Sequence, residues 1–167
     1  MATFRTNGFT EYPNNPANSV GKKMRSVFTE NTVTAAGGTD GDVYILAGPL
    51  TFDDKINAIK GATPAMTSAN DNDLGFYKKK SDGTFAAIDA DILWDGVTLV
   101  TALTYRELLG TLNTSLDRDD NIGKLLGLGN DAEPFGGVYL GLTINTKSTA
   151  TTVDLKLEVV IEEATTV

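Results

Sequence analysis

Residues 137–163 read GVYLGLTINTKSTATTVDLKLEVVIEE, and this stretch decides the fold class of the chain. Apolar side chains occupy alternate positions in two runs: Val138, Leu140, Leu142 and Ile144, then Val153, Leu155, Leu157, Val159 and Ile161. A period of two in residues rich in Val, Ile, Leu and Thr is typical of strands with one buried face. The polar residues 146–150 separate the runs, so we predict adjacent antiparallel strands at Gly137–Asn145 and Thr151–Glu163. Such a hairpin buries its apolar face only against more sheet, which predicts an all-β core.

Composition places the chain among single globular domains. It has 167 residues, of which 41% are hydrophobic and 22% charged. No apolar run approaches the roughly 20 residues of a transmembrane helix, and the first residues lack the charged-then-apolar order of a signal peptide. We therefore expect no membrane partner. The chain has no His and no Cys, which excludes imidazole acid–base catalysis, thiolate nucleophiles and Cys/His zinc sites. We expect no enzyme, although catalysis by carboxylates alone remains open.

Charge is unevenly distributed along the chain. The net charge is −8, from 14 basic and 22 acidic side chains. Residues 1–30 hold four basic and two acidic groups, a net of +2, so the other 137 residues hold 10 basic and 20 acidic groups, a net of −10. An acidic body repels nucleic acid, so we expect no nucleic-acid partner.

Residues 1–31 differ in composition from the remaining chain. Pro13 and Pro16 lie in a polar stretch and disfavour both helix and central strand. Large aromatic side chains are nevertheless scattered through this segment. We predict an extended arm at 1–31, docked on its own body or on a neighbouring subunit, and a β-sandwich domain at 32–167; the alternative for the arm is a free tail. The side chains expected to bind a partner are Phe4, Phe9, Tyr12, Lys22, Lys23, Arg25 and Phe28.

Further strands are predicted at 42–46 and 97–103, and a hairpin at 74–88 around the turn Ser81-Asp82-Gly83. Residues 55–62 fit either one helical turn, through Ile56 and Ile59, or an extended segment, and we favour a strand. Thr104 and Glu107 have the spacing of a capping box, which predicts a helix through the leucines that follow. A second short helix is predicted at Asn121–Leu126. Together these elements predict a mainly β fold: a jelly-roll-like antiparallel β-sandwich with one or two short helices and an extended N-terminal arm.

Three smaller features have a structural and a functional interpretation. Asn70–Asp73 places four side-chain oxygens in a row, as Ca²⁺ prefers, but such clusters are more typical of a turn before a strand. Trp94 is expected in the core or at an interface. The run Lys78-Lys79-Lys80 is expected at the solvated end of a hairpin.

A second candidate cation site follows the predicted first helix. Asp117, Asp119 and Asn121 occupy the first, third and fifth positions of the EF-hand pattern. Ile122 then stands where the pattern needs Gly, and Leu128 where it needs a bidentate Glu. We therefore favour capping of the Asn121–Leu126 helix by Asp119, Asp120 or Asn121. The sequence predicts no metal, no cofactor and no catalytic residue.

Three segments, taken in order, resemble small virion proteins of tailed bacteriophages. They are Asp71–Tyr77 (DNDLGFY), Asn121–Leu128 (NIGKLLGL) and Tyr139–Thr146 (YLGLTINT) with the closing strand. The resemblance covers roughly residues 42–163, and the arm also resembles the extended segments with which such proteins grip capsid subunits. The family is that of capsid decoration, or cement, proteins.

The resemblance implies a structural role on the virion. It implies a β-sandwich that binds the major capsid protein on the outer surface of the assembled shell, stabilises the shell, and is made in the host cytoplasm. It also implies a homo-oligomer, with a trimer favoured, and no catalytic residue. The alternative is a carbohydrate- or receptor-binding β-sandwich module of a virion, on a tail or head fibre.

Overall fold

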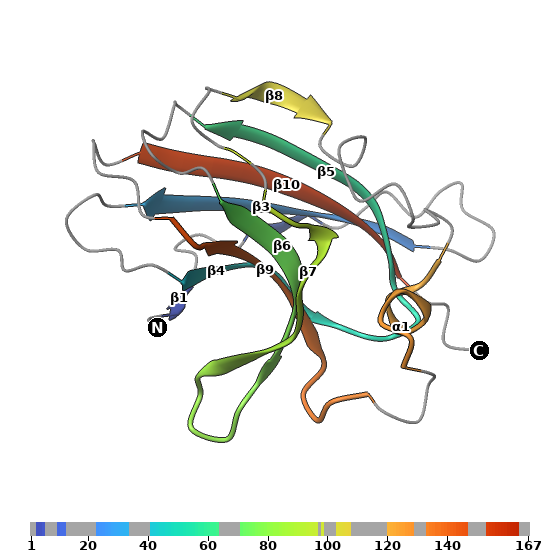
Figure 1. Ribbon diagram of the computed structural model, residues 1–167. Coiled ribbons are helices and arrows are strands. Elements are labelled where there is room, and N and C mark those ends of the chain that lie inside the picture. The colour runs from blue at the N-terminus through green and yellow to red at the C-terminus, as the bar shows by residue number, and fades with distance from the viewer. Residues whose placement is uncertain are drawn as a thin grey trace.

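A computed structural model of the chain describes residues 3–5, 10–12, 23–33, 41–63, 71–96, 98, 103–107, 120–128, 133–146 and 153–163. These residues form two five-stranded sheets, packed as a β-sandwich, and one short helix, α1 (Ile122–Leu125) (Figure 1). In sheet order, the first sheet contains β1 (Thr3–Arg5), β4 (Asp42–Leu50), β9 (Val138–Ile144), β6 (Asn72–Lys79) and β7 (Phe85–Trp94). The second contains β2 (Thr10–Tyr12), β3 (Lys23–Val33), β10 (Val153–Glu163), β5 (Lys55–Thr63) and β8 (Leu103–Glu107). The predicted mainly β sandwich is confirmed.

The strand pairing is nested. β6 pairs with β7, β5 with β8, β4 with β9 and β3 with β10, all antiparallel. Successive strands from β3 to β10 lie in opposite sheets, except for the central pair β6 and β7. The chain therefore folds back on itself around the β6–β7 hairpin, and the resulting four pairs are distributed over the two layers of the sandwich.

The interior lies between the sheets and is filled by the alternating apolar residues of the strands. Every apolar residue predicted on the inner face of β9 is buried, and so are Leu155, Leu157, Val159 and Ile161 of β10. Trp94 is also part of this core, with 4% of its surface exposed. A smaller buried cluster lies on the opposite face of the first sheet and contains Val43, Ile45, Tyr77 and Phe85. The first sheet is therefore covered with apolar contacts on both faces.

The prediction that the last two strands pair with each other is wrong. β9 pairs with β4 and β6, whereas β10 pairs with β3 and β5 in the other sheet. Their apolar faces meet across the interior, since both sets of side chains belong to one core cluster. Alternating apolar residues indicate that each strand has one buried face. They do not distinguish two strands that pair in one sheet from two strands that face each other across the core.

The predicted boundary between arm and sandwich also needs correction. Residues 23–31 belong to β3, which lies inside the second sheet between β2 and β10. Its inward-facing row includes Val27, Thr29 and Asn31, all buried, so only one of these three residues is apolar. Because the apolar alternation is weak, hydrophobic periodicity does not predict this strand. Of the remaining arm, β1 pairs with β4 and β2 pairs with β3, so both described pieces extend sheets of their own chain.

The other local predictions have mixed outcomes. The strands at 42–46 and 55–62 and the hairpin around Ser81–Gly83 are confirmed, with Gly83 at φ 84° in the turn. Thr104 and Glu107 lie in β8, so the capping box there is wrong, and the helix predicted after it lies outside the described residues, as does most of the strand predicted at 97–103. Pairing with β5 holds β8 in an extended conformation, and the local spacing of Thr104 and Glu107 contains no information about that pairing.

Candidate functional site

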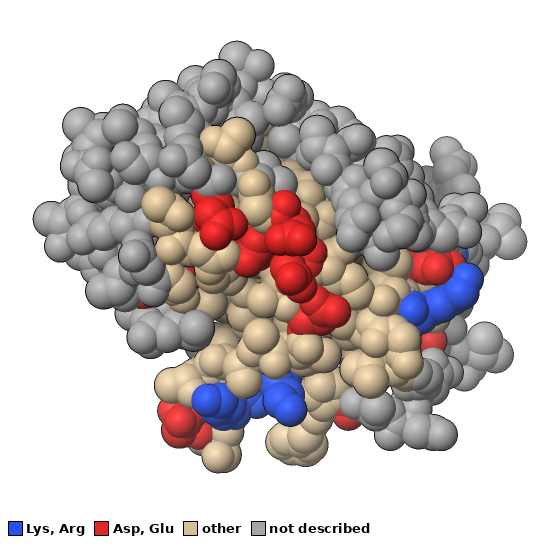
Figure 2. All heavy atoms as spheres, in the orientation of Figure 1, with Lys and Arg blue, Asp and Glu red and all other residues tan. Residues whose placement is uncertain are grey.

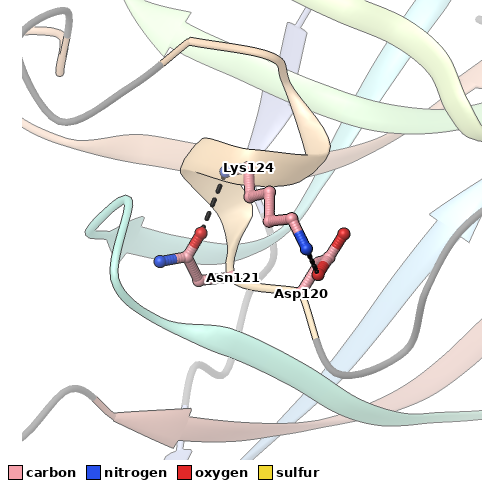
Figure 3. A network of polar contacts seen from close by, with 3 residues as sticks. All are labelled: Asp120, Asn121 and Lys124. Atoms are coloured by element: carbon pink, nitrogen blue, oxygen red, sulfur yellow. Dashed lines mark hydrogen bonds and ion pairs between the residues drawn. The ribbon is translucent and has the colours of Figure 1, made fainter.

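The predicted cap of α1 is confirmed. The Asn121 side chain accepts a hydrogen bond from the backbone N–H of Lys124 at 2.9 Å, and the Lys124 ammonium pairs with the Asp120 carboxylate (Figure 3). The helix is held against the sandwich by the backbone N–H groups of Ile122 and Gly123, which bond to the carbonyls of Asp54 and Phe52. Asn121 is thus engaged as a helix cap.

The other two weak metal candidates, Asp117 and Asp119, lie outside the described residues. Within the described part of the chain, no group of three or more Asp or Glu side chains is arranged to hold a metal ion. In the cluster at 70–73, Asn70 lies outside the described residues, and Asp71 and Asn72 are engaged in turn and strand contacts. The Asp71 carbonyl accepts from the backbone N–H groups of Asn145 and Thr146 at 3.0 and 3.3 Å, and Asn72 begins β6 and is buried.

The residues predicted to bind a partner through the arm are divided between both sheets. Phe4 lies in β1 opposite Tyr44, and Tyr12 lies in β2 opposite Ser26. Lys23, Arg25 and Phe28 lie in β3, while Phe9 and Lys22 are outside the described residues. Arg25 forms an ion pair with Glu163 of the same chain, Nε to Oε1 at 3.1 Å. Phe28 projects from the outer face of the second sheet and is 40% exposed.

A candidate site that the sequence analysis missed lies on the first sheet, where acidic side chains gather over β6 and β7 (Figure 2). We call it the acidic face. Its members come from the start of β6 and from β7 with the residues that follow it: Asp71, Asp73, Asp89, Asp91 and Asp95. Asp71, Asp91 and Asp95 are exposed, and Asp73 and Asp89 are partly buried. The lysines of the hairpin end lie below this face in the same view.

A large bulge in β7 shapes the acidic face. Leu74 pairs with Trp94, yet Phe76, two positions along β6, pairs with Asp89, five positions back along β7, so β7 holds three extra residues. The bulge crosses directly over Gly75, where an added Cβ would lie 2.2 Å from the Asp89 carbonyl oxygen and 2.4 Å from the Ala90 carbonyl carbon. Bulges redirect side chains from the regular alternation. Here the bulge brings Asp89 and Asp91 to the side of the sheet that also carries Tyr77.

Polar contacts fix one part of this face. One oxygen of Asp73 accepts from the backbone N–H of Gly96 at 2.9 Å, and the other accepts from the side-chain amide of Asn145. The hydroxyl groups of Tyr77 and Thr143 are hydrogen-bonded to each other beneath the carboxylates. These bonds tie the ends of β7 and β9 to β6, so the carboxylate of Asp73 is held in place.

Burial, with a smaller contribution from neighbouring negative charge, shifts the pKa of two groups at the acidic face. Burial raises the pKa of Asp89, and the hydrogen bond and the negative charge of Asp91 raise it further. Burial also raises the pKa of Tyr77, against the effect of its bond to Thr143, and the carboxylates of Asp73 and Asp91 add to the rise. The arrangement offers negative charge and hydrogen-bond acceptors to a cationic partner.

The alternation Asp89-Ala90-Asp91, directly after the strand predicted to end at Ile88, is the signal in the sequence for part of this face. It indicates two carboxylates on one side of a strand, provided that the strand is regular. Asp71, Asp73 and Asp95 join them only through the pairing of β6 with β7 and the bulge, which sequence spacing does not report.

No protein-family model, no curated protein and no solved structure matches the chain. Among the helical residues that the structure describes, none forms a helix long and apolar enough to cross a membrane.

Proposed function

We propose that this chain is a structural protein of a tailed-bacteriophage virion, a decoration or cement protein that binds the outer surface of the assembled capsid and stabilises it without catalysis. Its partner is the major capsid protein, and its place is the capsid surface. We further propose that it acts as a homo-oligomer, with a trimer as the expected state.

The observation that carries this proposal is the nested strand pairing. We interpret the orders β3-β10-β5-β8 and β4-β9-β6-β7 as a jelly roll, the double-sheet arrangement that recurs in viral capsid and lectin domains. The segments on which the phage resemblance rests also fall into this framework. The first and third are neighbouring strands, because β6 pairs with β9 from Asn72 opposite Ile144 to Lys78 opposite Val138.

The edges of the sandwich provide a second support. The short strands β1 and β2 lie at the edges of different sheets, so the N-terminal part of the chain contacts both layers of the body. A segment that pairs by backbone hydrogen bonds on its own sheets can do the same with a strand of a neighbour. This is the property that an anchoring arm on a shell requires.

The test is binding to DNA-free heads of the virus whose genome encodes the chain. The purified protein is mixed with heads that lack it, and bound protein is measured by co-sedimentation and by negative-stain microscopy. We expect saturable binding in regular positions and a higher temperature of shell disruption. Heads that remain bare at protein concentrations in the tens of micromolar would refute the proposal.

The alternative, a carbohydrate- or receptor-binding module, gives a different result in the same experiment. Such a module would leave the heads bare but would bind host cells, and removal of surface glycans would abolish that binding. Jelly rolls serve lectins as well as capsids, so the fold alone does not distinguish the two roles.

A further inference from the structure

Two loops leave the first sheet at the same end of its strands. Lys78 of β6 is paired with Val138 of β9, so the hairpin that follows β6 and the turn that precedes β9 project side by side (Figure 1). We call this region the lysine tip and define it by Lys78, Lys79, Lys80 and Phe135. All four side chains are exposed. Asp82 lies in the same hairpin, but its carboxylate is occupied by the backbone N–H and hydroxyl of Thr84, at 2.9 and 2.6 Å.

Phe135 is displayed by a well-defined turn. The phenyl ring is fully exposed, at 102%, whereas the other exposed large hydrophobic residues of the described chain, Met24 and Phe28, are 37% and 40% exposed. The N–H of Gly137 bonds to the carbonyl of Pro134 at 2.9 Å, and Gly136 has φ 87°, as a type II β-turn requires. An added Cβ on Gly137 would lie 2.8 Å from the Leu50 carbonyl oxygen, so the turn packs closely on β4. The turn that carries Phe135 is therefore supported by β4, whereas the Phe135 ring itself is fully exposed.

Asp71, Asp73 and Asp95 of the acidic face lie at the opposite end of the same strands. From Asp73 to Lys80 the chain advances seven residues, roughly 23 Å of extended strand. A lysine side chain spans only a fraction of that distance, so the tip of one molecule does not reach the part of its own acidic face around Asp73. Asp89, which pairs with Phe76 two residues before Lys78, is the member of the face nearest to the tip. The two surfaces are complementary in charge, and each is left available to another molecule.

We propose that the lysine tip of one copy docks on the acidic face of a second copy, in a head-to-tail contact. The three ammonium groups meet the exposed carboxylates of the face, and Phe135 supplies an apolar anchor at the centre of the contact. A contact between two different surfaces is heterologous, and it closes into a ring when the rotation between copies allows it. The inference depends on the self-association proposed above and not on binding to a shell.

The test is self-association of the full chain, measured by analytical ultracentrifugation at 50 mM and 500 mM NaCl. For the wild-type chain we expect species larger than the 17.7 kDa monomer at low salt and weaker association at high salt, because exposed charges are screened. Phe135→Ala and the double variant Lys79→Glu/Lys80→Glu should each weaken association by roughly tenfold or more. Met24→Ala is the control for an exposed apolar side chain and should change association by less than about twofold, because Met24 lies on the other sheet.

Charge reversal on the lysine tip and on the acidic face provides the decisive part of the experiment. Asp91→Lys/Asp95→Lys reverses two exposed members of the acidic face, and this variant should be monomeric alone, as should Lys79→Glu/Lys80→Glu. Mixed in equal amounts, the two should associate, because each carries the surface that the other lacks and the reversed surfaces also match. Circular dichroism of each variant verifies the fold. A wild-type monomer at all concentrations, equal effects of Met24→Ala and Phe135→Ala, or a mixture that stays monomeric would each overturn the proposal. Loss of shell binding with self-association intact would instead refute only the proposed function.

Discussion

Replacing Gly75 by Ala tests the bulge that builds the acidic face. Gly75 has no unusual φ, so a side chain there meets no backbone strain of its own, but its added Cβ would lie 2.2 Å from the Asp89 carbonyl oxygen. Real Cβ atoms stay at least 3.0 Å from such an atom, so the backbone of β7 must move by nearly 1 Å. The atoms in the way belong to the main chain and cannot rotate aside. The substitution therefore disrupts the pairing between β6 and β7.

The expected loss follows from the cost of overpacking. Forced backbone shifts in a packed interior cost about 1–3 kcal/mol, and the contact with rigid backbone places Gly75→Ala near the upper value, about 3 kcal/mol. For a chain of this size that corresponds to a fall of roughly 6–12 °C in Tm. The assay is urea denaturation followed by tryptophan fluorescence. Trp94 is the only tryptophan, is buried, and pairs with Leu74 beside the bulge.

Gly83→Ala is the matched control. Gly83 has φ 84° and nothing within 4 Å of an added Cβ, so it has space but an unfavourable backbone conformation. We expect a loss of about 1 kcal/mol there, and a smaller loss for Gly83→Asn, because Asn adopts positive φ more readily. If Gly75→Ala destabilises the protein no more than Gly83→Ala does, the close passage of β7 over Gly75 is refuted.

Three further changes test the titration, the helix cap and the core. Folding raises the pKa of Asp89, so the protonated form favours the folded state. The free energy of unfolding therefore falls as pH rises from the pKa of the unfolded state, near 4, through the pKa of the folded state. Asp89→Asn should be more stable than wild type at pH 7 by roughly 0.5 kcal/mol, and the difference should vanish below about pH 4. A constant difference from pH 3 to 7 in urea titrations would contradict this account. Asn121→Ala should destabilise the protein by about 1 kcal/mol, whereas Asn121→Ser should be nearly neutral, as thermal melts would show. Val159→Ala, at a fully buried position, should cost about 2 kcal/mol, and Val160→Ala, at the partly buried neighbouring position, clearly less. Equal losses in denaturation would contradict the assignment of Val159 to the buried face of β10.

The sequence by itself determined where most strands lie and which of their faces are buried. Leu140 and Leu142 of β9, and Leu157 and Val159 of β10, are all in the core, because alternation follows directly from the geometry of an extended chain. The turn at Ser81–Gly83 and the cap at Asn121 were also predictable, since each depends on groups within a few residues of one another.

Apart from the β6–β7 hairpin, tertiary structure alone decided which strands pair. β9 and β10 follow each other in the chain but occupy opposite sheets, because a strand's backbone groups bond equally well to any edge and alternation carries no information about the neighbour. The sequence pattern does not separate β3 from the arm, because the inward row of β3 includes Thr29 and Asn31, whose place is set by β10 beside them. The acidic face arises in the same way. Its carboxylates are distant in sequence, and only the bulge over Gly75 and the pairing of β6 with β7 bring them together.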